Sequence, residues 1–485
     1  MEKFLAKIHM PRWLEVLLGF VFLAKIPSFF EPFYYGDELI YLTLGNAIRQ
    51  GLTLYKDIHD NKPPFLYILA AIAGNVFWFK VILCFWSLLT IVLFWKLAKR
   101  LLDDRKKETV AVITFAILTT LPLLEGNIAN AENFLIGFVI TAFLIIFSLK
   151  NNFKNLFFAG CMLSFAVLFK VPAVFDIGAI VLFWLITNPK DIKKIVYLSL
   201  GVIVPVSITF VWYYFKGALP DYLKAAFLQN VGYLSSFRPG DVAQPFLVKN
   251  GPLLIRGGVI LLGSFALWIK RKTLSPEFVF ATLWLLTSLF AAALSERPYP
   301  HYLLQTVAPA AILISILIYS KNMEQIFSLI PLCILVFVPV FYKYSYYPTF
   351  SYYTRFTEFA LGKINKNQYM SSFDRNTTAN YEIADFISKS SRVEDRIFVW
   401  GDSPAIYALS RRLPAIKYTA AYHVLDFSSK KEILSELTSK KPAFIVILLG
   451  SPNFDELQVL LNKSYLLIST VDGAQLWHKL ITSPK

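Results

Sequence analysis

Charged residues are scarce in this sequence. Only 16% of the 485 residues are Asp, Glu, Lys or Arg, whereas 56% are hydrophobic. A soluble domain has about 25% charged residues, and the apolar residues here form long blocks that charge rarely interrupts. This composition excludes an ordinary soluble protein and predicts a chain that spans a membrane several times.

Motifs for metal and nucleotide binding are also lacking. The three cysteines lie inside apolar blocks, and their spacing matches neither a metal site nor a disulfide framework. No Gly-rich phosphate loop is present, which disfavours an enzyme that binds nucleotides. No internal repeat is evident, and this absence weighs against a secondary transporter built from duplicated halves.

The sequence contains instead a series of apolar segments of membrane-spanning length. A bilayer core needs about 20 apolar residues per helix, and Pro172 is expected to end one such helix and begin the next. About eleven segments are candidates by this length, namely 13–33, 77–96, 109–125, 133–149, 156–171, 172–188, 196–215, 252–269, 277–294, 303–320 and 326–343.

Basic residues set the predicted orientation of these segments. They are dense at the N-terminus and in short loops, and sparse in the longer loops on the opposite side. The dense loops are 96–107, 190–194 and 270–272, and the sparse loops are 34–62 and 216–251. The positive-inside rule then places the N-terminus in the cytoplasm, and an odd number of spans places the C-terminus outside. The same distribution accounts for the net charge of +16 without nucleic acid as a partner.

The character of the chain changes after residue 343. Segments typical of strands at 396–400, 443–448 and 465–471 alternate with helical segments, and this alternation predicts a small α/β layer domain. The expected fold is therefore a polytopic α-helical membrane protein with a C-terminal extracytoplasmic α/β domain. Its predicted parts are a transmembrane domain at 1–343, a linker with short helices at 344–380 and the α/β domain at 381–485.

Polar residues that are unusual near a membrane gather on the predicted outer side. In the first outer loop, 39–48 has apolar residues at helical spacing, which suits a helix lying in the membrane interface. Charge near a bilayer is costly, so its default interpretation is functional. The residues concerned are Lys25, Asp37, Glu38, Asp57, His59, Asp60, Lys62, Glu132, Lys170, Arg297, His301 and Tyr302.

Such a set of residues suits group transfer from a phosphate-linked donor. A carboxylate can act as general base on an acceptor hydroxyl, and basic side chains can hold the leaving phosphate. A site on the outer side has little access to nucleotide sugars. A sugar linked to polyprenyl phosphate, which the membrane itself delivers, fits this placement.

The first outer loop resembles that of the GT-C glycosyltransferases. Asp37-Glu38 follows the first span, and Lys62-Pro63-Pro64 precedes the next apolar segment. This arrangement is similar to the bacterial protein O-mannosyltransferase and lipid A aminoarabinose transferase branch of that superfamily. The segment 297–302 resembles a late outer-loop motif of the same branch. The resemblance implies the GT-C fold for the transmembrane domain.

The resemblance also implies roles for individual residues. Asp37 would be the catalytic base, and Glu38 and Glu132 would be further acidic residues of the active site. Lys62 would contact the lipid phosphate, while Arg297 and His301 would line the donor pocket.

Position alone suggests further candidates. Lys25 and Lys170 lie near the outer ends of their helices and are candidates for contacts with the phosphate. The loop residues with possible supporting roles are Asp57, His59, Asp60 and Tyr302. Asn61 stands where the aminoarabinose transferases have a metal-binding Glu, so the sequence leaves a divalent cation open.

The predicted function is an inverting glycosyltransferase of the plasma (inner) membrane. It would move a sugar from a polyprenyl-phosphate donor, among membrane lipids, to a protein, lipid or glycan acceptor at the outer face. The sequence is also compatible with an enzyme of the same layout that moves an oligosaccharide. Two rival interpretations are a polytopic transporter or flippase and a non-catalytic scaffold with an outer binding domain. A transporter would place charges near mid-bilayer, and a scaffold would tolerate loss of the first-loop acids.

Overall fold

The protein is described by a computed structural model over residues 10–232 and 245–480. The first residues of the basic N-terminus and the middle of the loop 216–251, both used above for orientation, lie outside these ranges. The chain forms two compact units. The bundle unit contains Met1–Ser28, Lys80–Ile208 and Tyr233–Phe350, and the sheet unit contains Phe29–Phe79, Thr209–Gly232 and Ser351–Lys485.

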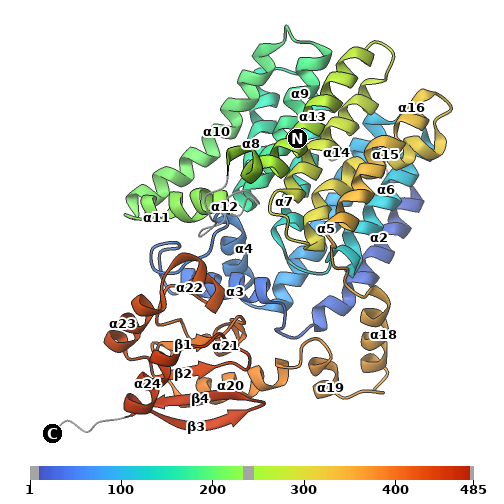
Figure 1. The fold of residues 1–485 in the computed structure, drawn as a ribbon. Coiled ribbons are helices and arrows are strands. Elements are labelled where there is room, and N and C mark those ends of the chain that lie inside the picture. Colours follow the sequence, from blue (N-terminus) through green and yellow to red (C-terminus); the bar gives the residue numbers. More distant parts are fainter. Residues whose placement is uncertain (1–9, 233–244, 481–485) are drawn as a thin grey trace. The chain divides into compact units, whose positions relative to one another are not determined.

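Eight of the described helical segments are long and apolar enough to cross a membrane (Figure 1). They are Arg12–Phe30 (α2 and η1), Val76–Leu101 (α5), Ala131–Ser148 (α7), Ile192–Phe215 (α10), Phe246–Lys270 (α13), Pro276–Ala293 (α14), Pro300–Tyr319 (η5 and α15) and Met323–Phe341 (α16 and α17). Three shorter helices lie on the remaining predicted spans, namely Arg105–Thr120 (α6), Phe153–Phe169 (α8) and Val174–Thr187 (α9). The protein is a multi-pass membrane protein, as predicted, and the number of eleven spans stays a prediction.

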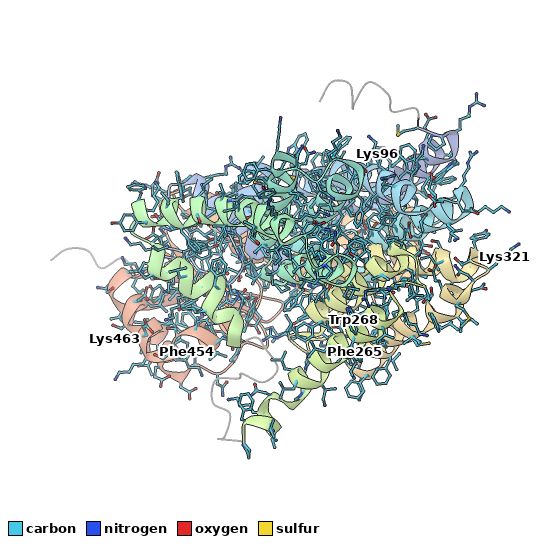
Figure 2. All side chains as sticks on the ribbon, turned by 90° about the horizontal axis from the view of Figure 1, so that it is seen from above. Lys96, Phe265, Trp268, Lys321, Phe454 and Lys463 are labelled. Carbon is cyan, nitrogen blue, oxygen red and sulfur yellow. The ribbon has the colours of Figure 1, made fainter. Side chains whose placement is uncertain are left out.

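The helices of the bundle unit differ in how deeply they are buried. α7, α14 and α15 are mostly enclosed by other helices, whereas α13 is almost entirely exposed. In the interior, the Phe143 ring packs edge-on against the rings of Phe280 and Trp284, with distances between ring centroids of 5.0 and 4.8 Å. On α13, the exposed side chains of Phe265 and Trp268 stack on each other (Figure 2), and their ring centroids lie 5.9 Å apart. In a membrane protein, exposed apolar side chains of this kind face lipid.

Sequence signals explain where several of these helices begin and end. The Asp104 side chain accepts the backbone N–H groups of Lys106 and Lys107 and caps α6. Pro172 separates α8 from α9 within the short 3₁₀ turn Val171–Ala173 (η3), as predicted.

Two glycines let helices α8 and α10 approach closely. A Cβ atom on Gly160 would lie 2.2 Å from the Leu198 carbonyl oxygen, and one on Gly201 would lie 2.0 Å from that of Phe157. Small residues at such crossings are the usual means of helix packing inside a membrane.

The sheet unit contains a four-stranded mixed sheet with strand order β1-β2-β4-β3. Ile397–Trp400 (β1) runs parallel to Phe444–Ile447 (β2), and Ala474–Lys479 (β4) pairs antiparallel with both β2 and Tyr465–Val471 (β3). The three predicted strands are confirmed as β1, β2 and β3. β4 and the helix Ala421–Phe427 (α22) were not predicted.

Side chains of the central strands alternate between two cores. Phe398 and Trp400 enter a core completed by Lys430–Lys440 (α23) and Asp455–Ser464 (α24). Val399, from the same strand, enters a second core completed by Thr377–Ser390 (α20) and Ala405–Ser410 (α21). This period of two places helices on both faces of the sheet and confirms the α/β layer domain.

The predicted first outer loop belongs to the sheet unit. It contains the helices Gly36–Arg49 (α3) and Phe65–Ala73 (α4), and α3 packs against α21. The Tyr352 hydroxyl donates to Glu31 Oε1 at 2.5 Å, and the Phe33 amide donates to the Tyr381 hydroxyl at 3.2 Å. The unit thus joins segments that the predicted boundaries had assigned to three separate parts.

One expectation for this region differs from the structure. The helix predicted at 39–48 forms, but 39–45 is buried on all sides rather than along one apolar face. The predicted linker 344–380 contains the expected short helices, Thr349–Ala360 (α18) and Lys366–Ser371 (α19). The unit also contains three short helical elements, namely Leu219–Leu223 (α11), the π turn Lys224–Leu228 (η4) and Gln229–Gly232 (α12).

Candidate functional site

Asp37 and Lys62, the two central residues of the first-loop prediction, lie side by side in the sheet unit. Lys62 Nζ lies 3.8 Å from Asp37 Oδ2. The Tyr41 hydroxyl, one helical turn after Asp37 on α3, donates to the same oxygen at 2.9 Å. Lys62 Nζ also lies 4.9 Å from the centre of the Tyr41 ring. The carboxylate is therefore held by a hydroxyl and a cation at once.

The two neighbouring acids of α3 are placed differently. Both lie in the first turn of the helix, where the backbone N–H groups and the helix dipole favour negative charge. The Asp37 side chain is 33% exposed, whereas Glu38 is 2% exposed. Asp37 is thus the acid that a substrate can reach, and Glu38 is part of the core.

Asp60 organises the backbone around Lys62. Its carboxylate accepts hydrogen bonds from the Tyr67 hydroxyl at 2.7 Å and from the Asn61 backbone amide at 2.8 Å. The Tyr67 oxygen in turn accepts a hydrogen bond from the Lys62 backbone amide at 3.1 Å. The Tyr55 hydroxyl donates to the Lys62 carbonyl at 2.8 Å. Buried Asp60 therefore fixes the position from which the Lys62 side chain extends.

Charge and burial compete at Asp60. Burial raises the pKa of this carboxyl, but Lys62, His423 and the hydrogen bonds from Tyr67 and Asn61 outweigh burial and lower it overall. The carboxylate form is accordingly the one that this arrangement stabilises.

His59 and His423 close this network on the side of the α/β layer. Both are buried, and His423 Nε2 lies 3.6 Å from Asp60 Oδ1. Burial lowers the pKa of His59 to about 3 and also lowers the pKa of His423, so both rings are neutral near pH 7. The backbone amide of His59 donates to the Lys417 carbonyl at 2.8 Å, which ties the loop to the sheet domain.

Asp57 has a local structural contact. Its Oδ2 atom accepts the Thr53 amide at 2.7 Å and closes a turn of the first loop. The side chain is otherwise exposed.

A second acid–base pair lies in the bundle unit. Glu132 lies in the first turn of α7, and its carboxylate pairs with the ammonium of Lys170, the residue that follows α8. Lys170 Nζ also lies 3.7 Å from the centre of the Tyr302 ring. Asp176, the next acid along the chain after Lys170, accepts hydrogen bonds from Trp284 at 2.8 Å and Gln305 at 2.6 Å.

The loop between α6 and α7 is held by several buried polar residues. His301 Nδ1 lies 2.5 Å from Glu125 Oε2. Lys25 donates to the Gly126 carbonyl, and Lys80 donates to the Asn127 carbonyl at 2.8 Å. These contacts give Lys25 and His301 a role in holding this loop. The contact of Lys25 with the phosphate and the place of His301 in the donor pocket stay predictions.

Arg297 lies after α14, in the segment that leads to η5. Its backbone amide donates to Ser295 Oγ at 3.4 Å, and the residue is half-buried. The convergence of Asp37, Lys62, Glu132 and Arg297 in one cavity stays a prediction.

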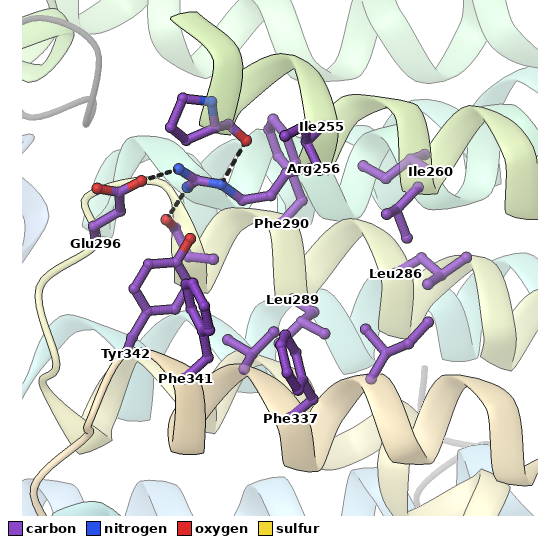
Figure 3. A pocket seen from close by; sticks show the side chains of 15 residues that line it. Ile255, Arg256, Ile260, Leu286, Leu289, Phe290, Glu296, Phe337, Phe341 and Tyr342 are labelled. Atoms are coloured by element: carbon purple, nitrogen blue, oxygen red, sulfur yellow. Dashed lines mark hydrogen bonds and ion pairs between the residues drawn. The ribbon is translucent and has the colours of Figure 1, made fainter. Parts of the chain in front are cut away.

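An apolar cavity of about 590 Å³ lies between α13, α14 and α17 of the bundle unit (Figure 3). Most of its lining is aliphatic or aromatic, but Arg256 and Glu296 lie at one end. The guanidinium pairs with the Glu296 carboxylate, donates to the Pro252 carbonyl at 3.0 Å and lies 5.8 Å from the centre of the Tyr342 ring. A cation at the end of an apolar cavity suits a ligand with a long apolar tail and an anionic head.

Comparisons with known proteins agree with this architecture. Residues 62–214 match the family described as Dolichyl-phosphate-mannose-protein mannosyltransferase, and residues 378–475 match the C-terminal domain family of the competence-induced protein Ccs4. No curated protein matches over the chain.

The solved structure of ArnT from Cupriavidus metallidurans bound to undecaprenyl phosphate has 14% sequence identity and a TM-score of 0.60. The match covers 98% of this chain and 99% of that one. The apo state of the same protein gives a TM-score of 0.55 at the same identity and coverage. The chain therefore has the same fold as ArnT. The oligosaccharyltransferase AglB from Archaeoglobus fulgidus, in complex with an inhibitory peptide and a dolichol-phosphate, matches with 14% identity over 90% of this chain and 69% of that one, at a TM-score of 0.42.

Three polar residues of this protein were not predicted from the sequence. Arg256 interrupts an otherwise apolar span, and that interruption was a usable signal. Lys80 gave the same signal within α5. His423 gave none, because its contact with Asp60 joins segments far apart in the sequence.

The described part of the chain has no group of three or more His, Cys, Asp or Glu side chains placed to hold a metal ion. Asn61 stands at the position discussed above for a metal ligand. Its backbone carbonyl oxygen accepts a hydrogen bond from the Asn230 side-chain amide at 2.9 Å.

Proposed function

We propose that the protein is a membrane glycosyltransferase that takes its sugar from a polyprenyl-phosphate-linked donor. The cavity that ends at Arg256 carries this proposal. Its apolar walls suit an isoprenoid chain, and a guanidinium is the side chain best matched to a phosphate. The GT-C fold and the undecaprenyl phosphate in the ArnT structure support the same class of donor.

In this proposal the phosphate head group takes the place of the Glu296 carboxylate on Arg256. An exchange of one anion for another leaves the guanidinium paired in both states, which avoids an isolated charge at membrane depth. The basic residues Lys62, Lys170 and Arg297, together with Lys25 and His301, are the further candidates for contacts with the donor.

Asp37 is the proposed general base. It accepts the proton of the acceptor hydroxyl while that oxygen attacks the anomeric carbon of the sugar. The bond from this carbon to the phosphate oxygen breaks, and the phosphate leaves with the electron pair, so the anomeric configuration inverts. Its exposed carboxylate, oriented by Tyr41 and adjacent to Lys62, has the accessibility that this step requires.

The proposed location is the plasma (inner) membrane, with the N-terminus in the cytoplasm and the sheet unit outside. The acceptor is a protein, a lipid or a glycan. A requirement for a divalent cation is tested by assaying transfer with Mg²⁺, with Mn²⁺ and with EDTA.

Mass spectrometry of polyprenyl-linked sugars in membranes tests the function directly. Cells that lack the gene should accumulate one carrier-linked sugar and lose the matching glycoconjugate. Unchanged pools of both would contradict the proposal.

A pair of variants connects this result to the cavity. Arg256→Gln should reproduce the accumulation, because it removes the cation at the end of the cavity. Arg271→Gln, a half-buried arginine just after the same helix and outside the cavity, should behave as wild type. Equal effects of the two substitutions would show that Arg256 has no special role.

A further inference from the structure

A second cavity, of about 560 Å³, lies entirely within the sheet unit. Its walls come from the first-loop turn at 52–57, the segment 414–417, helix α23 and Arg396, which directly precedes β1. Its volume is in the range of small-molecule sites. Unlike the Arg256 cavity, it is lined largely by charged side chains.

The carboxylates of this cavity already have hydrogen-bond donors from the chain. Glu436 pairs with Lys440 at 2.7 Å, and Glu432 accepts the Ser428 hydroxyl at 2.7 Å. Asp57 accepts the Thr53 amide, as described above. Within the described chain, none of these three acids forms an ion pair with a lining cation other than Lys440.

Three cations of the cavity therefore have no carboxylate at ion-pair distance among residues 10–232 and 245–480. They are Lys56, Arg396 and Lys417. Burial lowers the pKa of Arg396, and the more distant charge of Asp57 offsets this only in part. An incoming anion would supply the missing partner, and arginine and lysine are the side chains that most often bind carboxylate and phosphate groups.

We propose that this cavity is the acceptor site and that it binds an anionic saccharide, one that carries a phosphate or a carboxylate group. The proposal rests on the proposed glycosyltransferase function. The three cations bind the anionic group, while Glu432 and Glu436 accept hydrogen bonds from sugar hydroxyls. A cavity several times larger than a single anion also leaves room for the sugar ring beside the charged group.

Direct binding to the purified full-length protein in detergent tests this proposal without the donor. The probes are trigalacturonate, which carries carboxylates, glucose 6-phosphate, maltotriose as a neutral sugar, and inorganic phosphate. Calorimetry should show that at least one of the two anionic sugars, trigalacturonate or glucose 6-phosphate, binds at least about tenfold more tightly than maltotriose and inorganic phosphate. The tighter of the two anionic probes identifies the charged group.

Matched variants connect the binding to the cavity. Arg396→Gln and Lys417→Gln should each weaken anionic-sugar binding on the order of tenfold. Lys431→Gln, an exposed lysine on α23 outside the cavity, should bind as wild type. Circular dichroism of each variant shows whether it has folded, and two independent positions guard against the failure of one.

Three results would overturn the proposal. They are equal binding of maltotriose and the anionic sugars, equal losses in Lys431→Gln and Arg396→Gln, and inorganic phosphate binding as tightly as glucose 6-phosphate. Asp37→Asn separates this proposal from the proposed function, because it should bind anionic sugars normally while transfer is lost. An Asp37→Asn variant with full transfer would remove the assigned catalytic role and leave the binding result unaffected.

Discussion

Two acid–lysine pairs among the candidate site residues, one in each unit, are built in opposite ways. In the sheet unit, Asp37 and Lys62 are 3.8 Å apart and their side chains are 33% and 19% exposed. In the bundle unit, Glu132 is 3% exposed and in direct contact with Lys170. The first pair is loose and accessible, and the second is tight and enclosed.

This difference indicates different roles for Asp37 and Glu132. A general base has to reach a substrate proton, which Asp37 can do and Glu132 cannot do without breaking its ion pair. A buried ion pair, in contrast, is strongly disturbed when one partner is removed. We therefore expect loss of Asp37 to affect catalysis and loss of Glu132 to affect stability.

The largest expected effect is on catalysis. Asp37→Asn should lower the rate of sugar transfer on the order of 10²–10⁴-fold, because the amide cannot accept the proton. The measurement is the initial rate with purified protein and lipid-linked donor. Asp385→Asn, an exposed acid paired with Lys389, is the matched control and should retain the wild-type rate. A normal rate for Asp37→Asn would show that another group is the base.

At the buried pair Glu132–Lys170, the expected effect is on stability rather than on catalysis. Glu132→Gln leaves the Lys170 charge without its partner and should lower the free energy of unfolding by about 3 kcal/mol. Thermal unfolding in detergent measures this loss, and Asp37→Asn should change it by less than about 1 kcal/mol. Replacing both members, as in Glu132→Leu with Lys170→Met, should restore much of the stability. Equal stabilities of all these proteins would refute the comparison.

Acid should destabilise the sheet unit through His59. Because the pKa is about 3 in the folded protein and 6.5 in the unfolded chain, the unfolded state binds the proton more tightly. This contribution to stability is present above pH 6.5 and should fall by about 2 kcal/mol between pH 7 and pH 5. His59→Phe should remove that part of the pH dependence. A variant with the same slope as wild type would exclude His59 as its source.

The smallest effect is expected at Tyr41. Tyr41→Phe removes one hydrogen bond to Asp37 and keeps the ring beside Lys62, so kcat/KM should fall by no more than about tenfold. Tyr346→Phe, at an exposed tyrosine, is the control and should leave the rate unchanged. A loss as large as that of Asp37→Asn would mean that the tyrosine takes part in proton transfer.

Local sequence patterns were sufficient for most elements of the fold. Hydrophobic length located the membrane helices, and alternation located β1, β2 and β3. β4 was missed although Asp472-Gly473, both at positive φ, form the tight turn that joins it to β3. An Asp-Gly turn between two alternating segments is a strong hairpin signal, so this strand was within reach of the sequence.

The candidate site was less accessible to sequence reasoning. Asp37 and Lys62 could be paired because a motif spans both residues. The contacts of Asp60 with His423, of His59 with Lys417 and of Arg256 with the apolar cavity depend on tertiary packing. No local periodicity encodes such contacts, and they appear only when the whole fold is known.

The union of early and late segments in the sheet unit has a consequence for biosynthesis. The Phe33–Tyr381 hydrogen bond joins residues 348 positions apart, so the segment that carries Asp37 is synthesised long before its partners. Contacts of such separation form late. The contacts that join the first loop to the late segments can therefore form only after residue 381 has been synthesised.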